Sequence, residues 1–145
     1  MNIREPGRRP VILFLCTGNS CRSQMAEGWL RTLGGGKVQA ASGGIEAHGI
    51  HPLAIQVMAE RGINLCTQHS KCLTDSLLEA ADWIITLCGH ADEHCPVVPG
   101  RVIREHWPLA DPARAGGSGE EVLEVFRTVR DEIERRVREL LGRLG

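Results

Sequence analysis

The chain has 145 residues, of which 42% are hydrophobic and 24% are charged, and its formal net charge is −1. This composition is typical of one globular domain, and the charge provides no basic surface for nucleic acid. No segment reaches the roughly 20 apolar residues of a membrane span, and the polar start does not resemble a secretory signal. We therefore expect a cytoplasmic monomer with six reduced cysteines, a flexible lead at 1–9 and a single domain at 10–145.

A strand, a short loop and a helix are predicted at the start of the domain. The apolar run 11–15 predicts a buried parallel strand, and apolar residues at helical spacing predict a helix over 22–33. In such a loop, backbone N–H groups converge on one point, where the helix dipole adds partial positive charge. This segment therefore predicts an oxyanion-binding cradle made by Thr17, Gly18, Asn19, Ser20, Cys21 and Arg22.

Cys16 stands at the mouth of this cradle and is the candidate nucleophile. We expect the loop amides, the Arg22 guanidinium and the Ser23 hydroxyl to stabilise its thiolate. The alternative is an inert thiol at a strand end with Arg22 as a surface charge, which suits a lone cysteine better than this Cys-x5-Arg-Ser pattern. Cys21 is expected to pack beneath the loop, and the alternative is a spare thiol that oxidises with Cys16.

The rest of the chain alternates helices with strands. We expect strands at 37–42, 82–87 and 102–103, and helices at 52–62, 74–81 and from the capping box Ser118-x-x-Glu121 onward. The last helix has a core-facing stripe of Val122, Phe126, Val129, Ile133, Val137 and Leu140. This order predicts an α/β fold, a three-layer sandwich with a four-stranded parallel sheet flanked by helices. Ligands of such sheets bind beyond the carboxyl ends of the strands, where both Cys16 and Cys88 are expected.

The short segment between Cys88 and Cys95 has three possible interpretations. If the segment is helical, it holds the two Cα atoms about 10.5 Å apart, beyond the roughly 6.8 Å that a disulfide allows. A bond would require unwinding, which Gly89 and Pro96 favour, so the segment is a candidate redox switch. The alternatives are a plain buried thiol pair or a zinc site of Cys88, His90, His94 and Cys95. Cys66, His69 and Cys72 meet no spacing rule and are assigned no role.

Asp111 lies in a proline-bounded loop after the fourth strand, at the same edge of the sheet. An oxygen leaves more easily when it is protonated, so Asp111 is a candidate general acid. An aspartate before a proline is also a common turn residue, and that alternative stays open.

The motif Cys16-Thr17-Gly18-Asn19-Ser20-Cys21-Arg22-Ser23-Gln24-Met25-Ala26-Glu27-Gly28-Trp29, together with Cys88, Cys95-Pro96 and Asp111-Pro112, resembles the thioredoxin-coupled arsenate reductases. These enzymes share the low-molecular-weight tyrosine phosphatase fold, and the resemblance covers nearly the whole chain. It implies that Cys16 attacks arsenate while Asp111 protonates the leaving oxygen. It further implies that Cys88 and then Cys95 act in a three-cysteine relay, regenerated by thioredoxin without a bound cofactor, in arsenic detoxification.

Some members of that family bind potassium through residues that match Asn19, Glu27 and Ser42 and through an aspartate. Lys71 stands at the position of the aspartate, so we expect its ammonium to replace the ion and the protein to hold no metal.

The alternative function is a low-molecular-weight protein tyrosine phosphatase that uses Cys16, Arg22 and Asp111. The segment 111–115 has no aromatic residue to hold a phenyl ring, and the chain contains no tyrosine. At most, weak activity on small aryl phosphates is expected. Two further rivals are a non-catalytic arsenite or zinc binder and a reductase that borrows a low-molecular-weight thiol.

Overall fold

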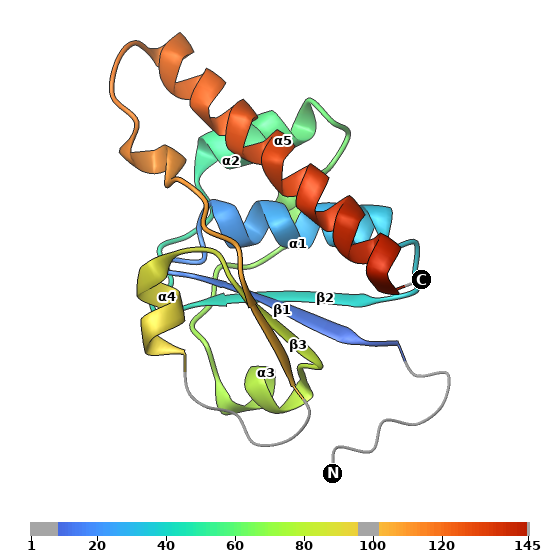
Figure 1. Ribbon diagram of the computed structural model, residues 1–145. Coiled ribbons are helices and arrows are strands. Elements are labelled where there is room, and N and C mark those ends of the chain that lie inside the picture. The colour runs from blue at the N-terminus through green and yellow to red at the C-terminus, as the bar shows by residue number, and fades with distance from the viewer. Residues whose placement is uncertain (1–8, 96–101, 145) are drawn as a thin grey trace.

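The computed structural model describes residues 9–95 and 102–144 (Figure 1). Four parallel strands form the sheet in the order β2-β1-β3-β4. Their bounds are β1 Val11–Cys16, β2 Gln39–Gly44, β3 Trp83–Thr86 and β4 Ile103–His106. The predicted parallel four-stranded sheet is confirmed. Pro96 and most of the predicted lead, residues 1–8, lie outside the described residues.

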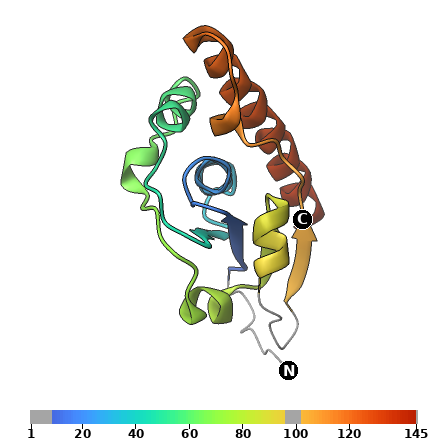
Figure 2. The ribbon, with the colours of Figure 1, turned by 90° about the vertical axis from the view of Figure 1, so that its left-hand side faces the viewer.

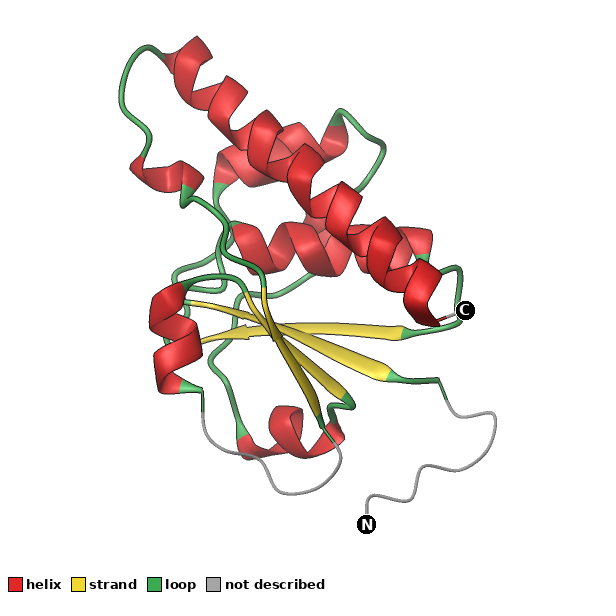
Figure 3. Cartoon of the chain, viewed as in Figure 1, coloured by secondary structure: helices red, strands yellow, loops and turns green. Residues whose placement is uncertain are grey.

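Helices cover both faces of the sheet (Figures 1 and 3). One face carries α1 (Arg22–Leu33), α2 (Pro52–Ala59) and the long α5 (Gly119–Leu144). The other face carries α3 (Asp75–Ala80) and α4 (Gly89–His94). Two 3-10 turns, η1 (Leu65–Thr67) and η2 (Pro112–Arg114), lie in the connections. The three predicted layers are present, and no helix in the described ranges is long and apolar enough to cross a membrane.

β1 is the centre of the hydrophobic core, and all six of its residues are buried. Because side chains alternate along a strand, Ile12 and Phe14 pack into the cluster under α1, α2 and α5, whereas Leu13 and Leu15 pack into the cluster on the α3 and α4 face. A strand that is covered on both faces reads as a continuous apolar run. This explains why β1 was easy to predict.

α5 begins at the predicted capping box. Ser118 Oγ accepts a hydrogen bond from Glu121 N at 3.2 Å, and Glu121 Oε1 accepts one from Ser118 N at 3.2 Å. The apolar stripe is buried from Phe126 onward, but Val122 is only partly buried and Leu123 is buried instead. Residues three and four positions before Phe126 border the same helix face, so spacing alone does not decide between them.

Several predicted boundaries were wrong. β2 continues through Gly43 and Gly44, which were expected to end it at 42, because these glycines pair with Leu15 and Cys16. A methyl group on Gly44 would lie 2.7 Å from the backbone nitrogen of Asn19, so only glycine brings β2 this close to the loop.

Other corrections come from polar residues and from helix caps. β4 runs over 103–106 rather than 102–103, because its polar, largely exposed edge-strand residues hide it from a hydrophobicity pattern. α2 ends at Ala59 rather than at 62, because residues 60–62 form a turn. α3 is one residue shorter at each end than predicted, because residues 74 and 81 are its caps. β3 runs over 83–86 rather than 82–87.

Candidate active site

The loop between β1 and α1 forms a cradle because its carbonyl groups accept hydrogen bonds from backbone N–H groups outside the loop. Glu46 N donates to Thr17 O at 2.8 Å, His48 N to Gly18 O at 2.9 Å and His51 N to Ser20 O at 3.1 Å. The N–H and C=O groups of a trans peptide point in opposite directions. The outward carbonyls therefore turn the N–H groups of the following residues toward the inside of the loop, as an oxyanion site requires. Gly18 allows this packing because a methyl group there would collide with the His48 ring.

Asn19 fixes the curvature of the loop. Its φ of 47° lies in the left-handed region, which asparagine tolerates better than most residues. The fully buried side chain accepts hydrogen bonds from Gln24 Nε2 at 2.9 Å and Lys71 N at 2.8 Å, and donates one to Ser23 Oγ at 2.8 Å. Gln24 was missed from the sequence because its position in α1 carries no signal for a loop contact.

The Cys16 sulfur lies inside the cradle. Cys16 is 2% exposed, and its Sγ is 2.8 Å from Ser23 Oγ. The Ser23 oxygen already accepts a hydrogen bond from Asn19, which leaves its own proton for the sulfur. When Cys16 is a thiolate, Ser23 is therefore the donor and stabilises the negative charge.

Arg22 projects beside the cradle from the first turn of α1. Its NH1 donates to Leu109 O at 3.1 Å, and its NH2 lies 3.7 Å from Asp111 Oδ2. Its Nε is buried and has no hydrogen-bond partner among the described residues. A buried charged donor without a partner is costly, and an oxyanion in the loop would satisfy it.

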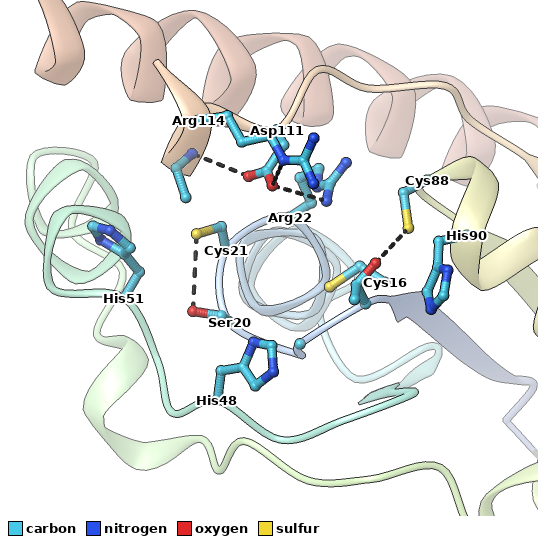
Figure 4. Close-up of a pocket in the computed structure, with 13 residues that line it drawn as sticks. Cys16, Ser20, Cys21, Arg22, His48, His51, Cys88, His90, Asp111 and Arg114 are labelled. Carbon is cyan, nitrogen blue, oxygen red and sulfur yellow. Dashed lines mark hydrogen bonds and ion pairs between the residues drawn. The ribbon is translucent and has the colours of Figure 1, made fainter. Parts of the chain in front are cut away.

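The cradle opens into a cavity of about 710 Å³ (Figure 4). Cys16, Arg22, Cys88 and Asp111 all line it, together with His48, His51, His90 and Arg114. The position of the last four in the cavity lining was not predicted, because α4, η2 and the segment after β2 bring them together and no spacing in the sequence connects them.

Asp111 is a turn residue whose carboxyl group also lines the cavity. Its Oδ1 accepts a hydrogen bond from Ala113 N at 3.0 Å and caps η2, as a turn aspartate does. Its Oδ2 lies 3.7 Å from both Arg22 and Arg114 at the cavity wall. One oxygen therefore orients the carboxyl group, and the other lies next to the cavity.

Cys88 brings a second thiol to the same cavity. It follows β3 as the N-cap of α4, where its Sγ accepts a hydrogen bond from Ala91 N at 3.3 Å. The same sulfur lies 3.3 Å from the Thr17 hydroxyl of the loop, and Figure 4 shows the Cys88 side chain pointing toward Cys16. The two cysteines expected at the carboxyl edge of the sheet thus both line one cavity.

Cys95 lies at the far end of α4. It is 7% exposed and packs with Ala91 and Leu13 in the smaller core cluster, where burial raises the pKa of its thiol. The segment between Cys88 and Cys95 is helical, as one reading of the sequence required.

The other three cysteines differ in their surroundings. Cys21 is buried, which raises the pKa of its thiol to about 12, but it lines the same cavity as Cys16 (Figure 4) and is therefore not packed away beneath the loop as expected. Cys66 and Cys72 are exposed. The zinc alternative at Cys88, His90, His94 and Cys95 finds no support, since the described ranges contain no group of three or more ligands able to hold a metal.

At the site where Lys71 was expected to replace a cation, the buried carboxylate of Glu27 lies between positive groups. Glu27 Oε1 accepts a hydrogen bond from Ser42 Oγ at 2.5 Å and lies 4.0 Å from Lys71 Nζ. Glu27 Oε2 is 3.1 Å from Arg31 NH1. Asn19 contacts the Lys71 backbone rather than its ammonium.

A parallel sheet with a Cys-x5-Arg loop at its carboxyl edge defines a thiol-based protein of oxyanion chemistry. The family described as low molecular weight phosphotyrosine protein phosphatase matches residues 11–145, and the chain belongs to this family. An arsenate reductase of Halalkalibacterium halodurans is 51% identical over 130 residues, which are 90% of this chain and 94% of that protein.

Solved structures of the same fold include reductases and a phosphatase. "An arsenate reductase in the phosphate binding state" has a TM-score of 0.77 at 38% identity, covering 94% of this chain and 99% of that one. The Corynebacterium glutamicum thioredoxin-dependent arsenate reductase has a TM-score of 0.76 at 31% identity, covering 95% and 63%. The YwlE arginine phosphatase of Geobacillus stearothermophilus has a TM-score of 0.78 at 28% identity, covering 93% and 92%.

Proposed function

We propose that this protein reduces arsenate to arsenite through a relay of Cys16, Cys88 and Cys95 that thioredoxin regenerates. The observation that carries the proposal is the position of Cys88, whose sulfur lines the same cavity as Cys16 and lies 3.3 Å from the Thr17 hydroxyl. A phosphatase releases its intermediate with water and needs no second thiol there. The names of the relatives at about half identity and of the thioredoxin-dependent neighbour support the same activity.

The first step is attack on the oxyanion. Arsenate binds to the loop amides and to the Arg22 guanidinium, whose buried Nε then gains an acceptor. The Cys16 thiolate forms a bond to arsenic, and an arsenic–oxygen bond breaks. Asp111 gives its proton to the departing oxygen, which leaves as water.

The second step transfers the electrons. The Cys88 thiolate attacks the Cys16 sulfur, and the sulfur–arsenic bond breaks with its electron pair remaining on arsenic. As(V) thereby becomes As(III) and leaves as arsenite, while the two sulfurs are oxidised to a disulfide. Cys95 then attacks Cys88, which frees Cys16, and thioredoxin reduces the Cys88–Cys95 disulfide.

The proposal includes the setting of the enzyme. It acts as a monomer in the cytoplasm, where thioredoxin is reduced, and it serves arsenic detoxification. It holds no cofactor of its own, because thioredoxin supplies every electron pair.

A cysteine-to-serine series tests the relay. We expect Cys16→Ser, Cys88→Ser and Cys95→Ser each to abolish multiple turnover with arsenate, thioredoxin, thioredoxin reductase and NADPH. Cys95→Ser should still release about one arsenite per protein in a burst and trap a Cys16–Cys88 disulfide, because only the last exchange is blocked. Arsenite release and peptide mass mapping report both results.

Cys66→Ser is the matched control, since Cys66 is an exposed thiol that does not line the cavity. It should turn over like the wild type. Multiple turnover by Cys95→Ser at the wild-type rate would refute the relay.

Phosphatase activity is the second candidate, because Cys16, Arg22 and Asp111 are also the groups that phosphate transfer needs. The family match and the arginine phosphatase neighbour favour a residual activity of this kind. We expect slow hydrolysis of a small aryl phosphate that persists in Cys88→Ser, where arsenate turnover is lost. Rapid hydrolysis together with no arsenite release by the wild type would favour the phosphatase instead.

A further inference from the structure

α4 is tied to the sheet by a group of three side chains, Thr86, Asp92 and Arg104, which we call the α4 latch. The Asp92 carboxylate accepts a hydrogen bond from Thr86 Oγ1 at 3.1 Å and one from Arg104 NH2 at 3.2 Å. Arg104 NH2 also donates to the backbone oxygen of Asp92 at 2.7 Å. Thr86 ends β3 and Arg104 lies in β4, beside which α4 runs in Figure 2. The latch therefore joins the helix to two strands.

The buried end of the latch is oriented by His106. The Thr86 hydroxyl lies 2.8 Å from His106 Nδ1, and Thr86 is fully buried. When His106 Nδ1 carries the proton and donates to Thr86, the hydroxyl proton is left for Asp92 Oδ1 at 3.1 Å, which is nearer than the other acceptor, Glu105 O at 3.4 Å. The hydrogen bond from Arg104 is the main reason that the pKa of Asp92 is lowered, and the hydrogen bond from Thr86 adds to it. The latch is thus a charge-assisted contact with a fixed direction.

α4 has few other supports. It is six residues long, and so short a helix is not stable by itself. Its N-cap acceptor is the Cys88 sulfur, and Ala91 and Cys95 anchor it in the smaller core cluster. In the proposed relay, the Cys88 thiolate becomes a neutral disulfide sulfur, which is a weaker acceptor for the Ala91 N–H. The first exchange therefore weakens the N-cap, and the latch and the two buried side chains remain to hold the helix.

We propose that Asp92 and Arg104 are positioning residues for the second thiol exchange: the latch keeps α4 folded while Cys88 acts on Cys16, and its release brings Cys95 to Cys88. This inference rests on the proposed relay. In the exchange, the Cys95 thiolate forms a bond to the Cys88 sulfur and the Cys16–Cys88 bond breaks. Cys16 leaves as a thiolate, and the proton of Cys95 goes to solvent.

Release of the latch changes both the distance and the reactivity of Cys95. A helix holds residues 88 and 95 about 10.5 Å apart, so their disulfide requires α4 to unwind. Unwinding also removes Cys95 from the core, where burial raises its pKa and keeps it protonated. The latch stabilises only the folded, dithiol state of the segment. Weakening it should therefore shift the thiol–disulfide equilibrium toward the disulfide.

Arg104→Met tests this without changing the sequence of α4. Arg104 is partly exposed in an edge strand, so the substitution leaves the core intact. We expect the amides of α4 to exchange about two- to fivefold faster with solvent in the reduced protein, the range for an exposed ion pair. The equilibrium of the Cys88–Cys95 disulfide with a dithiothreitol buffer should move by the same factor toward the disulfide. That factor corresponds to a potential about 9–21 mV more negative.

Two companion variants give the sign of the effect. Arg104→Lys keeps a cation near Asp92 and should recover part of both shifts. Gly89→Ala should move both quantities the opposite way, about two- to fivefold, since an added methyl at Gly89 contacts nothing within 4 Å. Arg138→Met is the matched control, because it makes the same arginine-to-methionine change at an exposed pair, Arg138–Glu134 at 2.9 Å, in α5 on the opposite face of the sheet from α4.

The outcomes separate the latch from the relay. If the wild type forms the Cys88–Cys95 disulfide but Arg104→Met shifts neither exchange nor equilibrium, the latch is wrong and the relay stands. If Arg104→Met and Arg138→Met shift them equally, the effect is general destabilisation and the latch is also wrong. If the wild type forms no such disulfide with arsenate, the proposed function fails, while amide exchange in the reduced protein still tests the contact.

Discussion

The ammonium group of Lys71 lies next to the buried carboxylate of Glu27. Its Nζ lies 4.0 Å from Glu27 Oε1 and donates a hydrogen bond to His69 O at 3.1 Å. Its backbone nitrogen holds the Asn19 side chain at 2.8 Å. Lys71 thus supplies one positive charge near Glu27 and one backbone hydrogen bond to the cradle.

We therefore expect arsenate turnover to be the same in potassium and in sodium at equal ionic strength. Lys71→Met should lower turnover, because the Glu27 carboxylate loses a neighbouring positive charge, while the backbone hydrogen bond to Asn19 is kept. Lys37→Met, which removes an exposed lysine, is the control and should have no effect. Steady-state rates in the two salts measure this, and clear stimulation of the wild type by potassium would contradict the role given to Lys71.

Single residues differ in how far the sequence reveals them. Cys16, Arg22 and Ser23 could be placed because they lie within one loop and one helix turn, where spacing determines geometry. His48 lines the same cavity from the loop after β2 and His90 lines it from α4, and neither histidine has a spacing that would indicate this.

α2 and α5 are joined by a cluster of charges at the end of α2. Glu60 caps α2 and binds Arg127 at 2.8 Å and Arg130 at 2.7 Å. Arg130 is almost fully buried and also donates to Val57 O at 2.9 Å. The hydrogen bond from Arg127 is the main cause that lowers the pKa of Glu60 to about 2. The carboxylate is therefore bound more tightly in the folded state than in the unfolded chain.

A lowered pKa stabilises the fold fully where the carboxylate is charged in both the folded and the unfolded state, and partly where it is charged only in the folded state. The Glu60 contribution should be complete above its ordinary pKa of 4.5 and lost as the pH falls from there to about 2. Glu60→Gln should thus lower the urea midpoint at pH 7, and the difference from the wild type should shrink toward pH 2. The exposed Glu79→Gln variant is the control. A difference that stays constant between pH 7 and pH 2 would contradict this linkage.

Elements were predicted best where burial is two-sided or where a cap is explicit. β1, α1 and the capping box of α5 were predicted correctly, because each leaves a local pattern. The bounds of β2 and β4 were wrong, because strand pairing extends across glycines and polar residues whose own preferences oppose a strand. Their bounds depend on the partner strand.

The stability of the whole molecule depends on the larger core cluster, which packs against α1, the helix that follows the cradle. Ile133 of α5 is fully buried in this cluster together with Phe14 of β1 and Met25 of α1. The helix that carries Arg22 is therefore held in place by packing against both the sheet and α5.

Ile133→Ala should lower the free energy of unfolding by about 2–5 kcal/mol, the usual cost of a buried isoleucine. Ile103→Ala is the matched control, because the same change at a 47% exposed position should cost within about 0.5 kcal/mol. Urea unfolding with unchanged slopes measures both. Equal losses in the two variants would contradict the assigned core.

The sequence by itself determined the α/β class, the order of the elements and the Cys16–Arg22–Ser23 cradle, because period, caps and loop spacing act over neighbouring residues. Only the tertiary structure decided that Thr17 meets Cys88 and that Arg104 holds Asp92, since these contacts span 71 and 12 residues. Their partners depend on how strands align at one edge of the sheet. That alignment is set by packing of the whole core, which no local pattern contains.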